Sequence, residues 1–81
     1  MRVLVLYFAA AKEAAGLASE TMELPEGTTV GSLLSRATTA HPRLEGLASS
    51  LRLAVGERFA PPTHVLEPGD TIALLPPASG G

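Results

Sequence analysis

The sequence predicts an α+β fold, a single domain spanning residues 1–81 in which one main helix packs on one face of a mixed sheet. Three observations lead to this prediction. Of its 81 residues, 46% are hydrophobic and 17% charged, which suits one modest core and is too apolar for a disordered chain. Val30, Leu33, Leu34 and Ala37 recur at helical spacing. Two apolar runs, residues 2–8 and 71–75, stand near the two ends of the chain.

The N-terminal part predicts two strands joined by a short helix. Residues 2–8, RVLVLYF, are rich in β-branched and aromatic residues, and we expect a strand that is buried on both faces or nearly so. Residues 9–16 are good helix formers that end at Gly16. Residues 19–24 alternate enough to form a second strand, paired with the first.

The main helix is predicted over residues 30–40. A turn at residues 25–27, which contains a proline and a glycine, precedes it, and Thr28 or Thr29 can cap its first turn. The helix closes at His41-Pro42, because the residue before a proline is disfavoured in the helical conformation.

The rest of the chain predicts further strands separated by turns. A strand at residues 51–55 is followed by a turn at 56–58. After Pro61-Pro62 we expect at most a short edge-like strand near 63–66. A type II turn at 67–70 then leads into a last strand at 71–75. The resulting order of elements is that of a ubiquitin-like β-grasp. With the two apolar runs side by side and parallel at the sheet centre, the C-terminus would leave from the middle of the sheet.

Composition excludes several classes of function. The chain has no cysteine, so disulfides, thiolate metal sites and thiol nucleophiles are ruled out. Its net charge is −2 and its six basic residues are scattered, which argues against nucleic acid and anionic membranes as partners. The N-terminal apolar run is too short to span a bilayer or to act as a secretion signal, and we expect a cytoplasmic protein.

A self-contained active site is not evident in the sequence. His41 and His64 stand next to or near prolines and are expected to be solvated loop residues, and Lys12 with Glu13 is most simply a solvated charge pair. Glycine-rich phosphate loops are also missing. We therefore expect the chain to bind no cofactor or metal itself.

The ending PPASGG, residues 76–81, has two interpretations: a disordered terminus without a function, or a functional C-terminal tail. Two prolines favour polyproline II, which lowers the entropy lost on capture, and two glycines let the backbone thread a narrow tunnel. Six residues at roughly 3.3–3.6 Å each reach about 20 Å. We expect this tail to be mobile after about Pro77. The carboxylate of Gly81 is unreactive until another enzyme activates it, and we expect that enzyme to form an acyl adenylate with ATP.

Four stretches carry a resemblance to a known family: VLVLYFAAAKEAAG, TTVGSLLSRATTAHPRL, LRLAVGE and LEPGDTIALLPPASGG. Together they resemble the small, sulfur-carrier subunit of molybdopterin synthase over essentially the whole chain. The ending is the most specific of the four. Lys12 stands where the family usually has arginine, and Gly56 where it often has asparagine.

The resemblance implies a β-grasp whose Gly81 is adenylated by a ubiquitin-activating-like adenylyltransferase and then converted to a thiocarboxylate with sulfur from a relay protein. It implies that the tail enters the large subunit of molybdopterin synthase, where its sulfur attacks cyclic pyranopterin monophosphate on the way to the dithiolene. In the family, two small subunits flank a dimer of large ones, and the catalytic side chains belong to the large subunit.

By the same resemblance, particular residues acquire roles. Gly81 carries the reacting carboxylate, and Phe8 and Leu75 belong to the apolar surface that docks both partners, with Lys12 beside it. The inserted tail comprises Pro76, Pro77, Ala78, Ser79, Gly80 and Gly81.

Three other functions remain open from the sequence. A thiamine-pathway sulfur carrier shares the fold, the tail and the activation but differs in the acceptor. A ubiquitin-like modifier would be joined to lysines of other proteins, although Lys12 is the only lysine here, so mixed-linkage polymers are impossible. A plain interaction module would tolerate deletion of Gly80 and Gly81.

Overall fold

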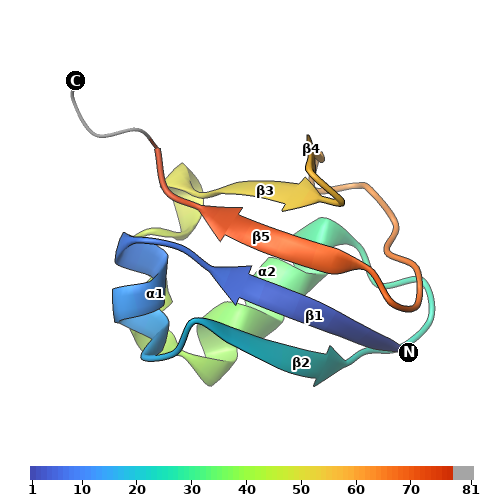
Figure 1. Ribbon diagram of the computed structural model, residues 1–81, viewed down its shortest axis with the longest axis horizontal. Helices are drawn as coiled ribbons and strands as arrows, with labels where there is room; N and C mark the ends of the chain where they lie inside the picture. Colours follow the sequence, from blue (N-terminus) through green and yellow to red (C-terminus); the bar gives the residue numbers. More distant parts are fainter. Residues whose placement is uncertain (78–81) are drawn as a thin grey trace.

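The first and last strands lie side by side at the centre of a five-stranded mixed sheet, as the sequence predicts (Figure 1). The computed structural model describes residues 1–77. The strands are ordered β2-β1-β5-β3-β4 across the sheet; β1 and β5 run parallel, and the other neighbours run antiparallel. Their bounds are β1 (Arg2–Tyr7), β2 (Ser19–Glu23), β3 (Arg52–Val55), β4 (Arg58–Phe59) and β5 (Thr71–Leu75).

Both predicted helices are present. The short α1 (Ala10–Ala15) ends at Gly16, whose φ of 81° is a left-handed conformation that glycine adopts without strain. The main helix α2 (Val30–Ala40) is capped by Thr29, whose side-chain oxygen accepts the backbone N–H of Ser32 at 3.2 Å. Two 3₁₀ turns that the sequence did not indicate follow α2, η1 (Pro42–Leu44) and η2 (Ala48–Ser50).

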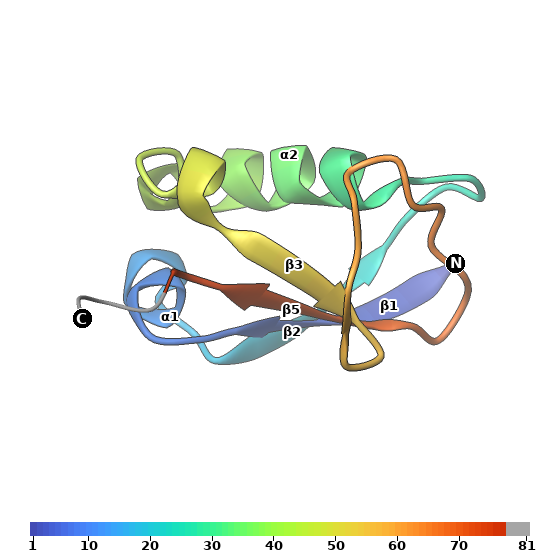
Figure 2. The same ribbon diagram turned by 90° about the horizontal axis from the view of Figure 1, so that it is seen from above.

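The hydrophobic core lies between α2 and one face of the sheet (Figure 2). Val30, Leu33 and Ala37 of α2 are buried, as the helical spacing predicts. Beneath them the sheet contributes the buried side chains Val3, Val5, Tyr7, Leu53, Ile72 and Leu74. With one main helix over one face of this sheet, the fold is the β-grasp that the order of elements indicates.

The expectation that β1 is buried on both faces is wrong. Its side chains alternate, with Val3, Val5 and Tyr7 buried under α2, while Leu4 and Leu6 point to the opposite face and are only partly covered. The physical reason is that the helix layer covers one face of the sheet only. An apolar sequence therefore produces an apolar surface on the other face instead of a second core.

The edge strand also differs from the prediction. The chain reverses at Gly56 and Glu57, whose φ angles of 55° and 71° build a tight hairpin turn, so the edge strand is β4. The segment 63–66, where a short strand was expected, makes only one isolated bridge, between Val65 and Thr29. The predicted turn at 67–70 is confirmed, with a φ of 84° at Gly69 and the Asp70 N–H donating to the Glu67 carbonyl at 3.1 Å.

Residues 60–64, here called the strap, cross from β4 to the start of α2. The Pro62 carbonyl accepts the Gly31 N–H and the His64 carbonyl accepts the Val30 N–H, both at 2.9 Å. A Cβ at Gly31 would come within 3.2 Å of Pro62, so any other residue there would push the strap away by a few tenths of an ångström. The strap thus satisfies two N–H groups that a helix N-terminus leaves open.

Among the described residues, none of the helices has the length and apolar character needed to cross a bilayer.

Candidate functional site

The face of the sheet opposite α2 carries an apolar surface, here called the open face. Leu6 and Ala73 are paired in register across β1 and β5, and Ala73 is paired in turn with Ala54 of β3. Leu4 is 36% exposed on the same face, and Phe8 and Phe59 are 44% and 60% exposed. We define the open face by the side chains of Leu4, Leu6, Phe8, Phe59, Ala73 and Leu75.

The open face is hollowed at its centre. A shallow depression of about 510 Å³ is lined chiefly by Leu6, Phe8, Ala54, Phe59, Ala73 and Leu75. Clustered apolar side chains that water can reach are typical of a surface that a partner covers. The depression is wide and mostly apolar, so it suits a protruding apolar side chain better than a charged small molecule.

Phe8 and Leu75, which the resemblance singled out, lie in this depression together. The Phe8 N–H donates to the Leu74 carbonyl at 3.3 Å, which extends the β1–β5 pairing by one residue beyond β1. Ala9 follows with a φ of 48°, a conformation that is costly for a residue with a Cβ, and turns the chain into α1. Phe8 is thus held at the junction of strand and helix, next to the last residue of β5.

Phe59 is a member of the open face that sequence reasoning missed. Its place in β4, opposite Ala54, brings the ring to the same face as Ala73, and the Arg52 guanidinium lies 4.1 Å from the ring centroid. This cation–π contact restrains the ring while leaving it exposed. The sequence does carry a signal, since Phe59 is one of only two phenylalanines, but it predicts no helix or strand at Phe59.

The C-terminal segment begins at the edge of this surface. Leu75 ends β5, the strand between β1 and β3, and Pro76 and Pro77 follow it directly. The predicted tail residues Ala78, Ser79, Gly80 and Gly81 lie outside the described residues. The segment therefore leaves the sheet from its middle, beside Phe8.

Lys12 does not line the open-face depression. It is exposed on α1, one turn after Phe8, and lines a separate shallow hollow with Ala9, Glu13, Gly16 and Leu17. Its backbone N–H approaches the Phe8 carbonyl at 3.4 Å. Lys12 is thus a charge near the rim of the open face, and its role in binding a partner stays a prediction.

His41 is not the solvated loop residue that the sequence suggested. Its Nε2 lies 2.5 Å from Oε2 of Glu20, and the same oxygen accepts the Tyr7 hydroxyl at 2.6 Å. The His41 and Tyr7 rings meet edge to face, with 5.6 Å between centroids. Through this cluster the C-terminal end of α2 contacts β1 and β2. The cluster lies on the face of the sheet that α2 covers.

The cluster shifts two pKa values in opposite directions. Burial raises the pKa of Tyr7 well above its ordinary value, and the hydrogen bond to Glu20 and the negative charge of Glu20 add to this. For Glu20, burial acts to raise the pKa, but the hydrogen bonds with Tyr7 and His41 and the His41 charge outweigh it, so the pKa is lowered. Glu20 therefore stays ionised and acts as the acceptor that organises the cluster, which is a structural role.

The described residues offer a surface for binding rather than groups for chemistry. Within residues 1–77, no three histidine, aspartate or glutamate side chains come close enough to hold a metal ion. Of the residues that line the depression, Glu57 is the one with an ionisable side chain, and Arg52 and Lys12 lie outside that lining, so the lining holds no acid–base pair. What the arrangement can do is present the segment after Leu75 to a partner that covers Phe8, Phe59 and Leu75.

Comparison with known proteins identifies relatives that match along the whole chain. The sequence pattern described as the ThiS family matches residues 5–81. The chain is 36% identical to the molybdopterin synthase sulfur carrier subunit of Chlamydomonas reinhardtii, over 100% of both chains. It is 37% identical to the protein of the same name in Homo sapiens, over 99% of this chain and 94% of the human one. Among solved structures, SAMP1 from Haloferax volcanii is similar with a TM-score of 0.90 and 26% identity, over 100% of both chains.

Proposed function

The chain belongs to the ThiS family, and from this premise we propose that it is the sulfur-carrier subunit of a molybdopterin synthase. Relatives with that name match it along its whole length. The observation that carries the proposal is the position of Leu75, where the central strand β5 ends inside an apolar surface that contains Phe8 and Phe59. A partner that covers this surface would receive the C-terminal segment directly.

The first step of the proposed cycle is activation of the C-terminus. A carboxylate oxygen of Gly81 attacks the α-phosphorus of ATP in a ubiquitin-activating-like adenylyltransferase, and pyrophosphate leaves. The terminal sulfur of a persulfide on a relay protein then attacks the carbonyl carbon and displaces AMP, which gives an acyl disulfide. A thiol attacks the relay sulfur of this S–S bond, forms a disulfide with it and releases the thiocarboxylate. ATP belongs to the activating enzyme, and the carrier contributes its terminus and its docking surface.

The second step is delivery of sulfur. The tail, Pro76 to Gly81, enters the large subunit of the synthase, where the thiocarboxylate sulfur attacks a carbon of cyclic pyranopterin monophosphate and displaces an oxygen substituent. Water then hydrolyses the resulting thioester, which leaves the sulfur on the pterin and returns Gly81 to its carboxylate. Two deliveries complete the dithiolene. The side chains that catalyse transfer belong to the large subunit, and Gly80 and Gly81, which have no Cβ, would let the end of the tail pass through a narrow tunnel.

The open face would serve both partners in turn. Burying a phenylalanine contributes about 1.5–3 kcal/mol, and aromatic side chains at the centre of an interface are frequent hot spots. Phe8 and Phe59 are the two exposed aromatic side chains of this face. Because the activating enzyme and the large subunit would cover the same side chains, they would exclude one another, and the carrier would have to dissociate between steps.

The test is the intact mass of the protein after incubation with ATP, a sulfur donor and the host activating enzyme. We expect the mass increase that corresponds to replacing one oxygen by sulfur, and no increase for a chain that lacks Gly81. The loaded carrier is then offered to the large subunit with cyclic pyranopterin monophosphate, where product formation identifies the acceptor. An unchanged mass, with the activating enzyme working on another carrier, would contradict the proposal; loading without transfer to the pterin would favour a thiamine-pathway carrier.

A second candidate function, conjugation to proteins, is favoured by the likeness to SAMP1, a small archaeal modifier protein. Recovery of this chain in isopeptide linkage to many host proteins would support it. Lys12 is the only lysine of the chain, so self-conjugation through lysine would produce a single linkage type.

A further inference from the structure

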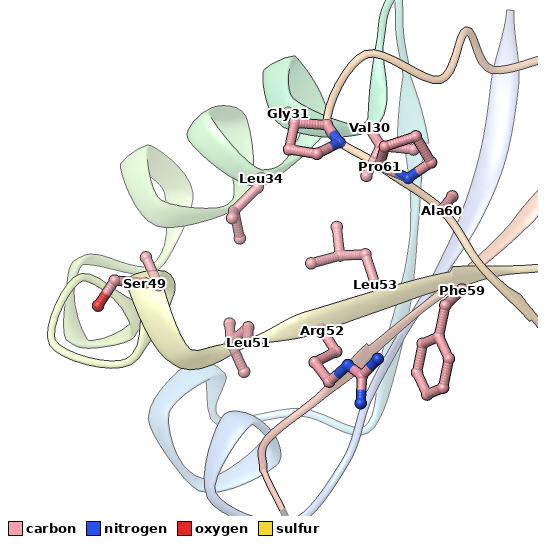
Figure 3. A pocket seen from close by; sticks show the side chains of 12 residues that line it. Val30, Gly31, Leu34, Ser49, Leu51, Arg52, Leu53, Phe59, Ala60 and Pro61 are labelled. Atoms are coloured by element: carbon pink, nitrogen blue, oxygen red, sulfur yellow. The ribbon is translucent and has the colours of Figure 1, made fainter.

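Arg52 stands at the rim of the open face, beside the last residue of β5. In the antiparallel β3–β5 pairing it lies directly opposite Leu75, so both side chains leave the sheet on the same face, with Cβ atoms about 4.5–5.5 Å apart. Figure 3, a view of the groove between α2 and β3, shows the Leu53 side chain directed toward α2 and the Arg52 side chain directed the other way, toward the Phe59 ring. Arg52 is therefore one strand away from the residue after which the C-terminal segment leaves the sheet.

The Arg52 guanidinium is held in place and still accessible. It lies 4.1 Å from the centroid of the Phe59 ring, and the residue is exposed. A guanidinium stacked on a ring covers one of its flat faces, while the N–H groups at its edge stay free to donate. Because the ring already restrains the side chain, less conformational entropy is lost when those N–H groups bind a partner.

The described part of the chain does not neutralise Arg52. The ion pairs within residues 1–77 join Arg2 with Glu23 and His41 with Glu20. A cation that loses its water against an apolar partner surface, without gaining an anion, costs binding free energy. A partner that covers Phe59 therefore has to meet the adjacent guanidinium with an anionic group.

Charge is distributed unevenly along the open face. Arg52 stands at the end of the depression where β5 finishes, whereas Glu57 lines the depression near the start of β5, since the N–H of the preceding Gly56 donates to the Thr71 carbonyl at 3.2 Å. A partner carboxylate that faces Arg52 in one orientation would approach Glu57 in the reversed one, and like charges that face each other disfavour that complex. The two charges thus select the orientation of a partner relative to the tail.

We propose that Arg52 binds an aspartate or glutamate side chain of the large subunit, beside the opening through which the tail enters. This inference rests on the proposed function, in which the large subunit covers the open face. Guanidinium and carboxylate can form two parallel N–H···O hydrogen bonds, a geometry that a single ammonium group does not match. The contact determines specificity, because it favours the orientation in which the segment after Leu75 points into the partner.

The first test measures the affinity of the full chain for the large subunit by isothermal titration calorimetry. Arg52→Glu should weaken binding at least about tenfold. Arg36→Glu is the matched control, because it makes the same change of charge at an exposed site on α2, on the other side of the sheet, and should change the affinity by less than about twofold.

The salt dependence separates a charge contact from a merely structural role of Arg52 in restraining the Phe59 ring. Arg52→Gln keeps a polar side chain but removes the charge. If the guanidinium binds a carboxylate, the affinity of the wild type should fall more steeply with salt than that of Arg52→Gln. An equal salt dependence would show that Arg52 acts only through Phe59, and it would overturn the proposal.

A crosslink identifies the group that Arg52 meets. Lys12 is the only lysine of the chain, so the double variant Lys12→Arg, Arg52→Lys carries its one lysine side chain at position 52. A water-soluble carbodiimide should join this amine, through an amide bond, to an aspartate or glutamate of the large subunit, and tandem mass spectrometry locates the bond. The control Lys12→Arg, Arg36→Lys should not form this link. A link from position 52 to the chain's own Gly81 carboxylate in its place would overturn the proposal.

The outcomes separate this inference from the function on which it rests. An unchanged affinity of Arg52→Glu for a large subunit that binds the wild type would overturn the inference and leave the proposed function in place. A wild type that does not bind the large subunit at all would overturn both. The crosslink keeps a positive charge at position 52, so it decides the question even if Arg52→Glu fails to fold.

Discussion

The two faces of the sheet are built from alternate residues of the same strands, yet they differ in what covers them. On one face Val5, Ile72 and Leu74 are fully buried under α2. On the other face, Phe8 and Phe59 remain about half exposed although they are as apolar as the core. A sheet of this kind usually alternates apolar and polar residues when one face meets water.

The difference shows that hydrophobicity alone does not identify the core of this protein. Leu74 and Leu75 are adjacent and chemically identical, but the first belongs to the fold and the second to the surface that we propose for docking. Variants on the two faces should therefore separate stability from function.

The largest effect on stability is expected at Leu74. Leu74→Ala removes a fully buried side chain beneath α2 and should lower the free energy of unfolding by about 2–5 kcal/mol. Leu75→Ala, next to it on the open face, should cost less than about 1 kcal/mol, because its side chain is already partly exposed. Urea denaturation of both variants measures the free energy of unfolding. An equal decrease in the two variants would show that the open face is part of the core.

The next largest effect is expected on partner binding. Phe59→Glu places a charge on the open face, in the lining of its depression, and should weaken binding of the large subunit by about tenfold to a hundredfold. The free energy of unfolding should change by less than about 1 kcal/mol, since Phe59 is exposed in a two-residue edge strand. Isothermal titration calorimetry with the large subunit measures the affinity. Val65→Glu is the control, because Val65 is an exposed apolar residue outside the open face. An unchanged affinity for Phe59→Glu would show that Phe59 is not part of the interface.

A smaller, pH-dependent effect on the free energy of unfolding is expected for Tyr7, on the sheet face that α2 covers. Tyr7→Phe removes the hydrogen bond to Glu20 and should cost about 1 kcal/mol near neutral pH. The pKa of Glu20 is lowered in the folded state, so its contribution is present above about pH 4.5 and is lost as the pH falls through the folded pKa. The pKa of Tyr7 is raised in the folded state, so its pH dependence is the opposite. Its contribution to the free energy of unfolding is present below about pH 10 and is lost as the pH rises above that value.

Denaturation of the wild type and Tyr7→Phe across this pH range makes the comparison. The difference in the free energy of unfolding between the wild type and Tyr7→Phe should be largest between about pH 4.5 and about pH 10. It should become smaller below and above this range. A difference that stays constant down to pH 3 would mean that the ionised state of Glu20 does not matter for the cluster.

The smallest effect is expected at the Arg2–Glu23 pair on the edge of the sheet. Arg2 Nε donates to Glu23 Oε1 at 2.8 Å, but the two side chains are 72% and 65% exposed. Arg2→Ala should therefore change the free energy of unfolding by less than about 0.5 kcal/mol, an amount that salt reduces further. A larger loss, measured by thermal or urea denaturation at low salt, would show that the edge of the open face contributes to the fold.

Much of the fold could be predicted because the signals were local. Gly16, Thr29 and Gly69 each mark a boundary through their own backbone preferences, and the structure confirms all three. The turn predicted at 56–58 is present at Gly56 and Glu57, but the strand β4 that follows it was missed because it is only two residues long. Phe8 and Leu75 were assigned to one surface through the resemblance, and the structure brings them into one depression.

The sequence by itself determined the order of elements, the helix boundaries and the parallel pairing of the first and last strands, because these follow from period, turn chemistry and the length of apolar runs. Only the tertiary structure decided which apolar residues are core and which are surface. It showed that β1 has one covered face, that Phe59 joins Phe8 and Leu75, and that Glu20 is the shared partner of Tyr7 and His41. The physical reason is that burial depends on which layer lies over a side chain, and that layer is supplied by residues distant in the sequence.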